Sequence, residues 1–263
     1  MSKPAKLIYM KIKLYLPAAV LIIGLLSSCS EHVYGPALHK SDISYMPKPM
    51  SMDSAKSATY VSAGLALDFG NNLSDQLTSG QLNISEAHTF KNFNLAYGAF
   101  TSLGNYSNYD LQQGDPHYFK DKFFGAVGGR LSGNFYINND GRTDIRIIGF
   151  EAAYSHEFGD YARFRKDVTG DPNFYTDTRT ELFTGGLTSE VVFHGRKPNT
   201  QMGFRLFVGE TFGNDNIYNN NKNDYITYKT PTYVAFSYFI QLKQYFAIVE
   251  GGTYVQFRVG VKF

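Results

Sequence analysis

The last ten residues of the chain alternate strictly between two kinds of side chain. Every second position is apolar: Val255, Phe257, Val259, Val261 and Phe263. The positions between them carry Tyr254, Gln256, Arg258, Gly260 and Lys262. Because successive side chains of a β-strand point to opposite faces, this period of two predicts a strand with two different surroundings.

The same alternation recurs along most of the chain and predicts further strands. They cover residues 59–69, 92–99, 106–112, 123–137, 143–158, 183–193, 202–208 and 234–242. The terminal stretch 245–263 is too long for one crossing, since about 9–11 residues span a membrane in a tilted strand, and Gly251-Gly252 supplies a turn within it. This division gives ten strands. Eight is the alternative, because residues 106–112 are poorly patterned.

Two local features refine these strands. In 143–158 the outward apolar series shifts from Ile145 and Ile147 to Ile148 and Phe150, which predicts a β-bulge. The connections also sort by length. Residues 70–88, 113–120, 159–176 and 214–224 form long loops at one end, and short turns near 103, 140, 197 and 243 lie at the other.

Composition agrees with an all-β protein. Aromatic residues make up 16% of the 263 residues, with 20 Tyr, 22 Phe, 25 Gly and no Trp, which suits strands, aromatic girdles and tight turns. We therefore predict an antiparallel transmembrane β-barrel over residues 58–263. A soluble lipid-binding barrel of lipocalin type is the rival fold, and it would reverse the two faces of every strand.

The amino terminus carries a secretory leader. Four lysines precede an apolar run over residues 14–26, as in a signal peptide. Without the leader the formal net charge of +2 becomes −2, and this balance does not favour nucleic acid. The Pro-containing stretch 30–57 is typical of a tether.

Leu26-Ser27-Ser28-Cys29 resembles the lipobox of bacterial lipoproteins. The resemblance implies that residues 1–28 are a cleaved signal peptide and that Cys29 is acylated, for example with palmitate. Residues 29–57 would then be the lipidated N-terminus and tether. Cys29 is the single cysteine, so an intramolecular disulfide is excluded.

The final strand, ending in Phe263, resembles the C-terminal signature of bacterial outer-membrane β-barrel proteins. Together the two resemblances imply an outer-membrane lipoprotein of a Gram-negative cell envelope, anchored through Cys29. The implied partners are outer-membrane lipid and the barrel-assembly and lipoprotein-sorting machineries. Lipopolysaccharide is a further candidate partner for the aromatic and basic loop 159–176, which contains Arg163, Arg165 and Lys166.

Six charged residues are predicted on the face away from lipid. A charge facing lipid at mid-membrane costs about 2–4 kcal/mol for Arg or Lys, and charges buried in a narrow lumen need partners. We therefore expect an ion-paired lumen, with a charged ligand site or a solute path as the alternatives. The residues are Arg130, Arg146, Glu151, Glu190, Arg205 and Arg258.

Three histidines, His88, His117 and His156, are predicted near the outer rim as a candidate site. Ser155-His156-Glu157 is consecutive, so in a regular strand His156 points away from both neighbours and no triad forms within it. No motif for a catalytic site, cofactor or metal is present. The sequence favours a structural or interaction role; the alternatives are an enzyme acting on lipid A or peptides, or a narrow channel or lipid carrier.

Overall fold

The computed structural model describes residues 32–69, 75–109, 111–139, 141–195, 200–213, 216–219, 224–227 and 232–263. The chain divides into two compact units, residues 1–32 and 33–263. The predicted signal peptide 1–28 and the predicted lipidation site Cys29 lie outside the described residues. The second unit contains every strand of the barrel.

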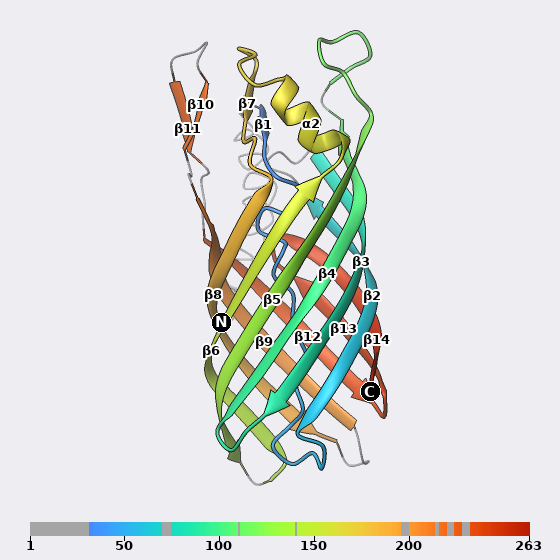
Figure 1. Cartoon of the computed structure of the whole chain (residues 1–263), viewed down its shortest axis with the longest axis vertical. Coiled ribbons are helices and arrows are strands. Elements are labelled where there is room, and N and C mark those ends of the chain that lie inside the picture. The colour runs from blue at the N-terminus through green and yellow to red at the C-terminus, as the bar shows by residue number, and fades with distance from the viewer. Residues whose placement is uncertain are drawn as a thin grey trace, which may run out of the picture. The chain divides into compact units, whose positions relative to one another are not determined.

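Ten strands of this unit form a closed antiparallel barrel (Figure 1). Consecutive strands pair in order around the barrel, and β14 closes it by pairing with β2, with Arg258 opposite Gly64. Closure leaves no strand edge of the barrel unpaired, which is what a sheet in lipid requires. The predicted fold class and the number of strands are confirmed. The strands are β2 (Ser57–Phe69), β3 (Asp75–Thr89), β4 (Phe93–Asn108), β5 (Asp121–Asn139), β6 (Thr143–Phe158), β8 (Glu181–His194), β9 (Thr200–Phe212), β12 (Thr232–Leu242), β13 (Tyr245–Gly251) and β14 (Tyr254–Lys262).

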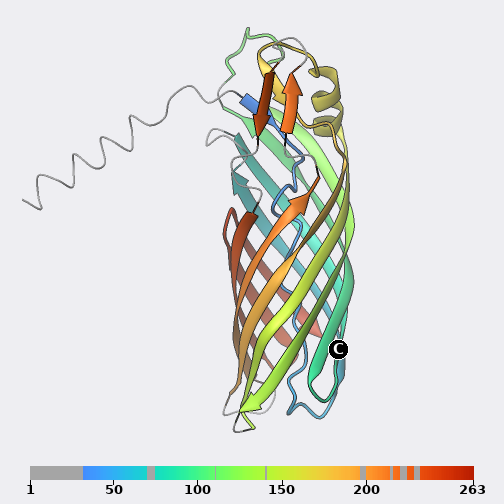
Figure 2. The ribbon, with the colours of Figure 1, turned by 90° about the vertical axis from the view of Figure 1, so that its left-hand side faces the viewer.

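The remaining elements are short. β1 (His32–Tyr34) pairs with β7 (Phe174–Thr176), β10 (Asn216–Asn219) pairs with β11 (Asp224–Thr227), and α2 covers Asp160–Asp167. In both views these elements gather at the end of the barrel to which the connections 109–120, 159–180 and 213–231 belong (Figures 1 and 2). We call this the long-loop end, and the other the short-turn end. None of the helices in the described residues is both long enough and apolar enough to cross a membrane.

The two faces of the barrel wall have opposite character. On β14, Val255, Phe257 and Val259 are 53%, 52% and 50% exposed on the outside, whereas Gln256 and Arg258 are almost fully buried. The same outward apolar series continues on β2, where Leu65 and Leu67 are exposed. An apolar outside and a polar inside are typical of a transmembrane barrel, and the reverse of a lipocalin-type soluble barrel.

A β-bulge in β6 lies where the sequence predicts it. The register between β6 and β8 shifts between Arg146 and Gly149, and Ile147 and Ile148 are both exposed. The extra residue lets two consecutive isoleucines face outward, while Arg146 before them and Glu151 beyond them both remain in the lumen. The bulge thus reconciles the apolar outside with two charges that the lumen needs.

Two local predictions are wrong. Residues 70–88, predicted as a loop, are largely strand β3, and the predicted turn near residue 103 is continuous strand within β4. Gly104, part of the apparent turn, is needed for close packing instead, because a Cβ there would lie 2.2 Å from the Thr78 carbonyl oxygen. The two errors offset each other, so the count of ten strands is unaffected.

The interior of the barrel is occupied by the chain's own residues 33–51, the lumen segment. Drawn in blue, it runs from β1 inside the barrel to the start of β2 (Figures 1 and 2). Residues 33–38 and 41–50 of it are buried. Its apolar side chains join inward-facing barrel residues in three clusters, one of which contains Tyr45, Tyr60 and Phe246. This part of the predicted tether therefore lies within the barrel.

Candidate functional site

The lumen segment crosses the barrel in a defined direction. Its first residues lie at the long-loop end, where the Tyr34 carbonyl oxygen accepts a hydrogen bond of 2.9 Å from the Asp177 N–H beside β7. Its last residues lie at the short-turn end. There the Ser51 N–H donates to Asp144 at 2.7 Å, close to the start of β6. Thr89, the last residue of β3, donates to the Pro49 carbonyl at 2.7 Å.

At the long-loop end, α2 packs its apolar face over the entering segment. Tyr161, Ala162, Phe164 and Arg165 are the buried residues of α2 and share one side of it. The Phe164 ring meets the Tyr34 ring edge-on at 5.1 Å, and the Tyr161 hydroxyl donates to the Gly35 carbonyl at 2.9 Å. Asp160 in the first turn and Lys166 in the last suit the helix dipole.

A buried ion pair joins this helix to the barrel and to the segment. Arg165 Nη1 lies 2.6 Å from Glu157 Oε1, and the other oxygen of Glu157 accepts the Ala37 N–H at 2.7 Å. Burial by itself would lower the pKa of Arg165, but Glu157, together with Tyr161 and Asp177, outweighs burial and raises that pKa above its ordinary value. Burial raises the pKa of the Tyr161 hydroxyl well above its ordinary range. The guanidinium therefore stays charged and Tyr161 stays neutral.

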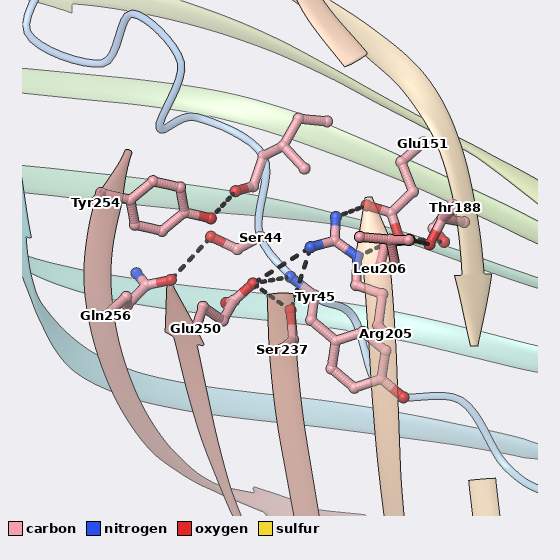
Figure 3. A network of polar contacts seen from close by, with 12 residues as sticks. Ser44, Tyr45, Glu151, Thr188, Arg205, Leu206, Ser237, Glu250, Tyr254 and Gln256 are labelled. Atoms are coloured by element: carbon pink, nitrogen blue, oxygen red, sulfur yellow. Dashed lines mark hydrogen bonds and ion pairs between the residues drawn. The ribbon is translucent and has the colours of Figure 1, made fainter. Parts of the chain in front are cut away.

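In the middle of the lumen, Glu250 of β13 is the centre of a polar network (Figure 3). Its carboxylate accepts the Tyr45 N–H at 2.9 Å and the Ser237 hydroxyl at 3.0 Å. It also pairs with Arg258 at 2.5 Å and with Arg205 at 3.6 Å. One carboxylate from the wall thus holds two wall cations and the main chain of the lumen segment.

The two arginines of this network have further partners. Arg258 donates to the Tyr45 carbonyl at 2.7 Å, so Tyr45 is held at both its N–H and its C=O. Arg205 pairs with Glu151 of β6, through two donors on the two carboxylate oxygens. Because every charge here lies opposite at least one of the other sign, the cost of removing them from water is partly offset.

A second ion group lies toward the short-turn end. Glu190 of β8 accepts from Lys48 Nζ at 2.9 Å and from Arg146 Nη1 at 2.6 Å. Arg146 also donates to the carbonyls of Lys48 and Pro49, each at 3.3 Å. Here the lumen segment contributes a charged side chain, and both side chains of the Lys48–Glu190 pair are fully buried.

Arg130 of β5 bonds a main-chain carbonyl and an amide oxygen, and no carboxylate among the described residues is its hydrogen-bond partner. It donates to the Asp42 carbonyl at 2.6 Å and to Asn83 Oδ1 at 2.6 Å, and its guanidinium lies 3.7 Å from the centre of the Phe100 ring. Donation from a charged guanidinium makes the first of these a strong hydrogen bond, and stacking on an aromatic face adds to it.

All six charged residues predicted for the lumen are buried. Four of them bond the lumen segment, and the other two, Glu151 and Arg205, pair with each other; the four are Arg130, Arg146, Glu190 and Arg258. Sequence reasoning missed three wall carboxylates that bond the lumen segment: Glu250, Glu157 and Asp144. Glu250 could have been found, because it continues the inward series of Phe246 and Ile248 on β13. Lys48 could not, since its stretch has no strand periodicity.

Most hydrogen bonds to the lumen segment are made with its main chain. Backbone groups of Ala37, Lys40, Asp42, Ile43, Tyr45, Lys48, Pro49 and Ser51 each bond a side chain of the wall. An extended chain without its own secondary structure must satisfy its N–H and C=O groups elsewhere, and here the wall provides the partners. Two cavities beside the segment measure about 10 Å³ each, room for roughly one water.

The three predicted histidines do not form one site. His117 lies at the long-loop end and pairs with Asp171 at 3.2 Å; His156, near the end of β6, lies 3.9 Å from Glu181. His88 lies at the short-turn end beside Glu86 at 3.3 Å. The prediction that His88 belongs to the outer rim is wrong, because β3 carries it to the opposite end. Within the described residues, no group of three or more His, Cys, Asp or Glu is placed to hold a metal ion.

Comparison with known proteins gives no family. No family model matches the chain. No curated protein sequence matches it either. Several solved structures of outer-membrane barrels are similar to this chain. One is Neisserial surface protein A, which has 10% sequence identity and a TM-score of 0.37; the match covers 80% of this chain and 98% of that one.

Two further barrels are similar at the same level. The transport unit of the autotransporter AIDA-I from Escherichia coli has 10% identity and TM-score 0.40, over 86% of this chain and 95% of that one. An outer-membrane channel from Pseudomonas putida F1 has 9% identity and TM-score 0.38, over 83% of this chain and 100% of that one. At these identities the similarity concerns the fold alone.

Proposed function

We propose that this protein is a lipid-anchored outer-membrane barrel with a structural or interaction role, which presents its long-loop end at the cell surface. The observation that carries the proposal is the lumen segment, buried over residues 41–50 and held by ion-paired wall residues. A lumen filled in this way supports a scaffold better than a channel. Long connections face outward in barrels of this class, and short turns face the periplasm.

The proposed partners follow from the chemistry of each surface. The apolar outside contacts outer-membrane lipid, and the alternating terminal strand is the element that the assembly machinery reads. Of the basic residues in loop 159–176, Arg163 is 76% exposed at its side chain, whereas Arg165 is fully buried in the pair with Glu157. Arg163 and Lys166 are therefore the residues available to lipopolysaccharide phosphates.

The scaffold proposal predicts that the intact barrel conducts no ions across a membrane. Purified wild-type protein in planar bilayers should show no steady ion current, because the lumen segment fills the path. A variant lacking residues 33–47 should show discrete current steps, since its lumen would keep the charged wall and lose the occupant. Adding a synthetic peptide of residues 33–50 to that variant should reduce the current. Steady current through the wild type would contradict the proposal.

The lipid anchor predicts acylation at one residue. Labelled palmitate fed to cells should enter the wild-type protein and not the Cys29→Ser variant, because no other cysteine is present. The control is Ser30→Ala, which leaves the thiol in place and should be labelled as the wild type is. Equal labelling of wild type and Cys29→Ser would rule out the anchor.

A further inference from the structure

The direction of the lumen segment decides where the chain before it emerges. A tether to an anchor in the inner leaflet would leave the barrel at the short-turn end. The described chain does the opposite: β1 is held at the long-loop end by β7, and only residues near Pro49 and Ser51 reach the short-turn end. The segment thus enters from the side of the surface loops and runs inward before β2 begins.

The short distance along the chain between Cys29 and the lumen segment limits where Cys29 can lie. Cys29 precedes Val33 by four residues, which span at most about 14 Å when fully extended. The hydrocarbon core of a membrane is about 30 Å thick. Val33 is buried, and Tyr34 packs among the aromatic residues of the long-loop end. Cys29 therefore cannot extend from that position to the inner leaflet.

We infer that the barrel carries its own lipidated N-terminus to the cell surface, so that the acyl chains on Cys29 enter the outer leaflet at the long-loop end. This inference rests on the proposed function, which supplies the acylated cysteine and the outward long-loop end. What the inference adds is the leaflet in which the acyl chains lie. The lumen segment passes through the membrane inside the barrel, so the anchor and the surface loops lie on the same side of the membrane.

The same geometry orders the events of assembly. The lumen segment is bonded by wall residues of strands from β3 to β14, and the cavities beside it hold about one water each. A residue carrying two or three acyl chains could not be drawn through so tightly filled a lumen. The segment must therefore be in place before β14 pairs with β2, and the strands close around it.

The experiment uses the single native cysteine. Acylation consumes the Cys29 thiol, so a cysteine introduced nearby becomes the one free thiol of the protein. We propose three variants of the full chain in intact cells: Glu31→Cys near the anchor, Thr253→Cys at the long-loop end, and Gln244→Cys at the short-turn end. Each is treated with a membrane-impermeant maleimide before or after permeabilisation of the outer membrane.

Glu31→Cys and Thr253→Cys should be labelled to the same extent on intact cells, and Gln244→Cys only after permeabilisation. Loss of intact-cell labelling at Glu31→Cys, with Thr253→Cys still labelled, would overturn the inference and leave the barrel orientation standing. Labelling of Gln244→Cys but not Thr253→Cys on intact cells would refute the orientation in the proposed function. Labelling of the wild type would show a free Cys29 thiol and refute the anchor.

A second measurement covers the case in which Glu31→Cys does not assemble. A short epitope inserted after Glu31 should bind an impermeant antibody on intact cells, and the same epitope inserted after Gln244 should not. Absence of binding after Glu31, with Thr253→Cys still labelled on intact cells, would overturn the inference. Binding after Gln244 alone would refute the orientation in the proposed function.

Discussion

Replacing Glu250 by alanine should lower the free energy of unfolding of the barrel by about 3–5 kcal/mol, because it breaks a fully buried ion group from one side. Arg258 would lose its carboxylate partner, and the Tyr45 N–H and the Ser237 hydroxyl would lose their acceptor. The measurement is urea unfolding of protein folded in lipid vesicles, followed by tyrosine fluorescence.

Two variants test whether the loss comes from this network. Glu250→Gln keeps an acceptor for Tyr45 but loses the charge, so it should lie between the wild type and Glu250→Ala. Asp160→Ala removes the carboxylate of an exposed pair with Arg163 on α2, which should cost about 1 kcal/mol or less. If Glu250→Ala and Asp160→Ala had the same small effect, the network would not stabilise the barrel.

Placing an arginine on the lipid face should also impair the barrel strongly. Val259 points outward between Ala247 and Ala63, its register partners on β13 and β2. Val259→Arg should cost about 2–4 kcal/mol if this position lies at mid-membrane depth. The expected result is a smaller fraction of folded, heat-modifiable protein in the outer-membrane fraction.

Two control variants separate the effect of the charge from the effect of side-chain size and from the effect of its position in the barrel. Val259→Leu adds volume without charge and should assemble as the wild type does. Thr253→Arg places the same charge in the exposed connection between β13 and β14 and should have little effect. Normal assembly of Val259→Arg together with failure of Val259→Leu would show that the outer face is packed against protein rather than lipid.

Strand β3 is an element that its sequence pattern does not predict. Its outward side chains include Leu82 and Ile84, but the other outward positions are Gln76, Thr78, Gly80, Glu86 and His88. Only a short part of the strand therefore carries an apolar signal. The strand is specified by hydrogen bonds to β2 and β4 along its whole length, and no local pattern contains that information.

The charged residues of the lumen could also be predicted only in part. Alternation predicted that Arg130, Arg205 and Arg258 would face inward, because a strand has two faces and lipid excludes charge from one of them. It could not predict which acid each arginine meets. Glu151 and Arg205 are 54 residues apart and lie on β6 and β9, which are not neighbours in the barrel. Both strands pair with β8, which lies between them, and this pairing brings the two side chains together.

By itself the sequence determined most of the alternating strands, the outward apolar face, and the bulge at Ile147 and Ile148, because each depends on local spacing and on the exclusion of charge from lipid. The count of ten strands was right because the missed strand β3 offset the extra strand predicted within β4. Only the tertiary structure decided what fills the lumen. Residues 33–51 have no periodicity and the composition of a linker, and they are ordered through main-chain bonds to side chains that distant strands provide. Main-chain groups are the same in every residue, so such a binding mode leaves no pattern in the sequence of the segment.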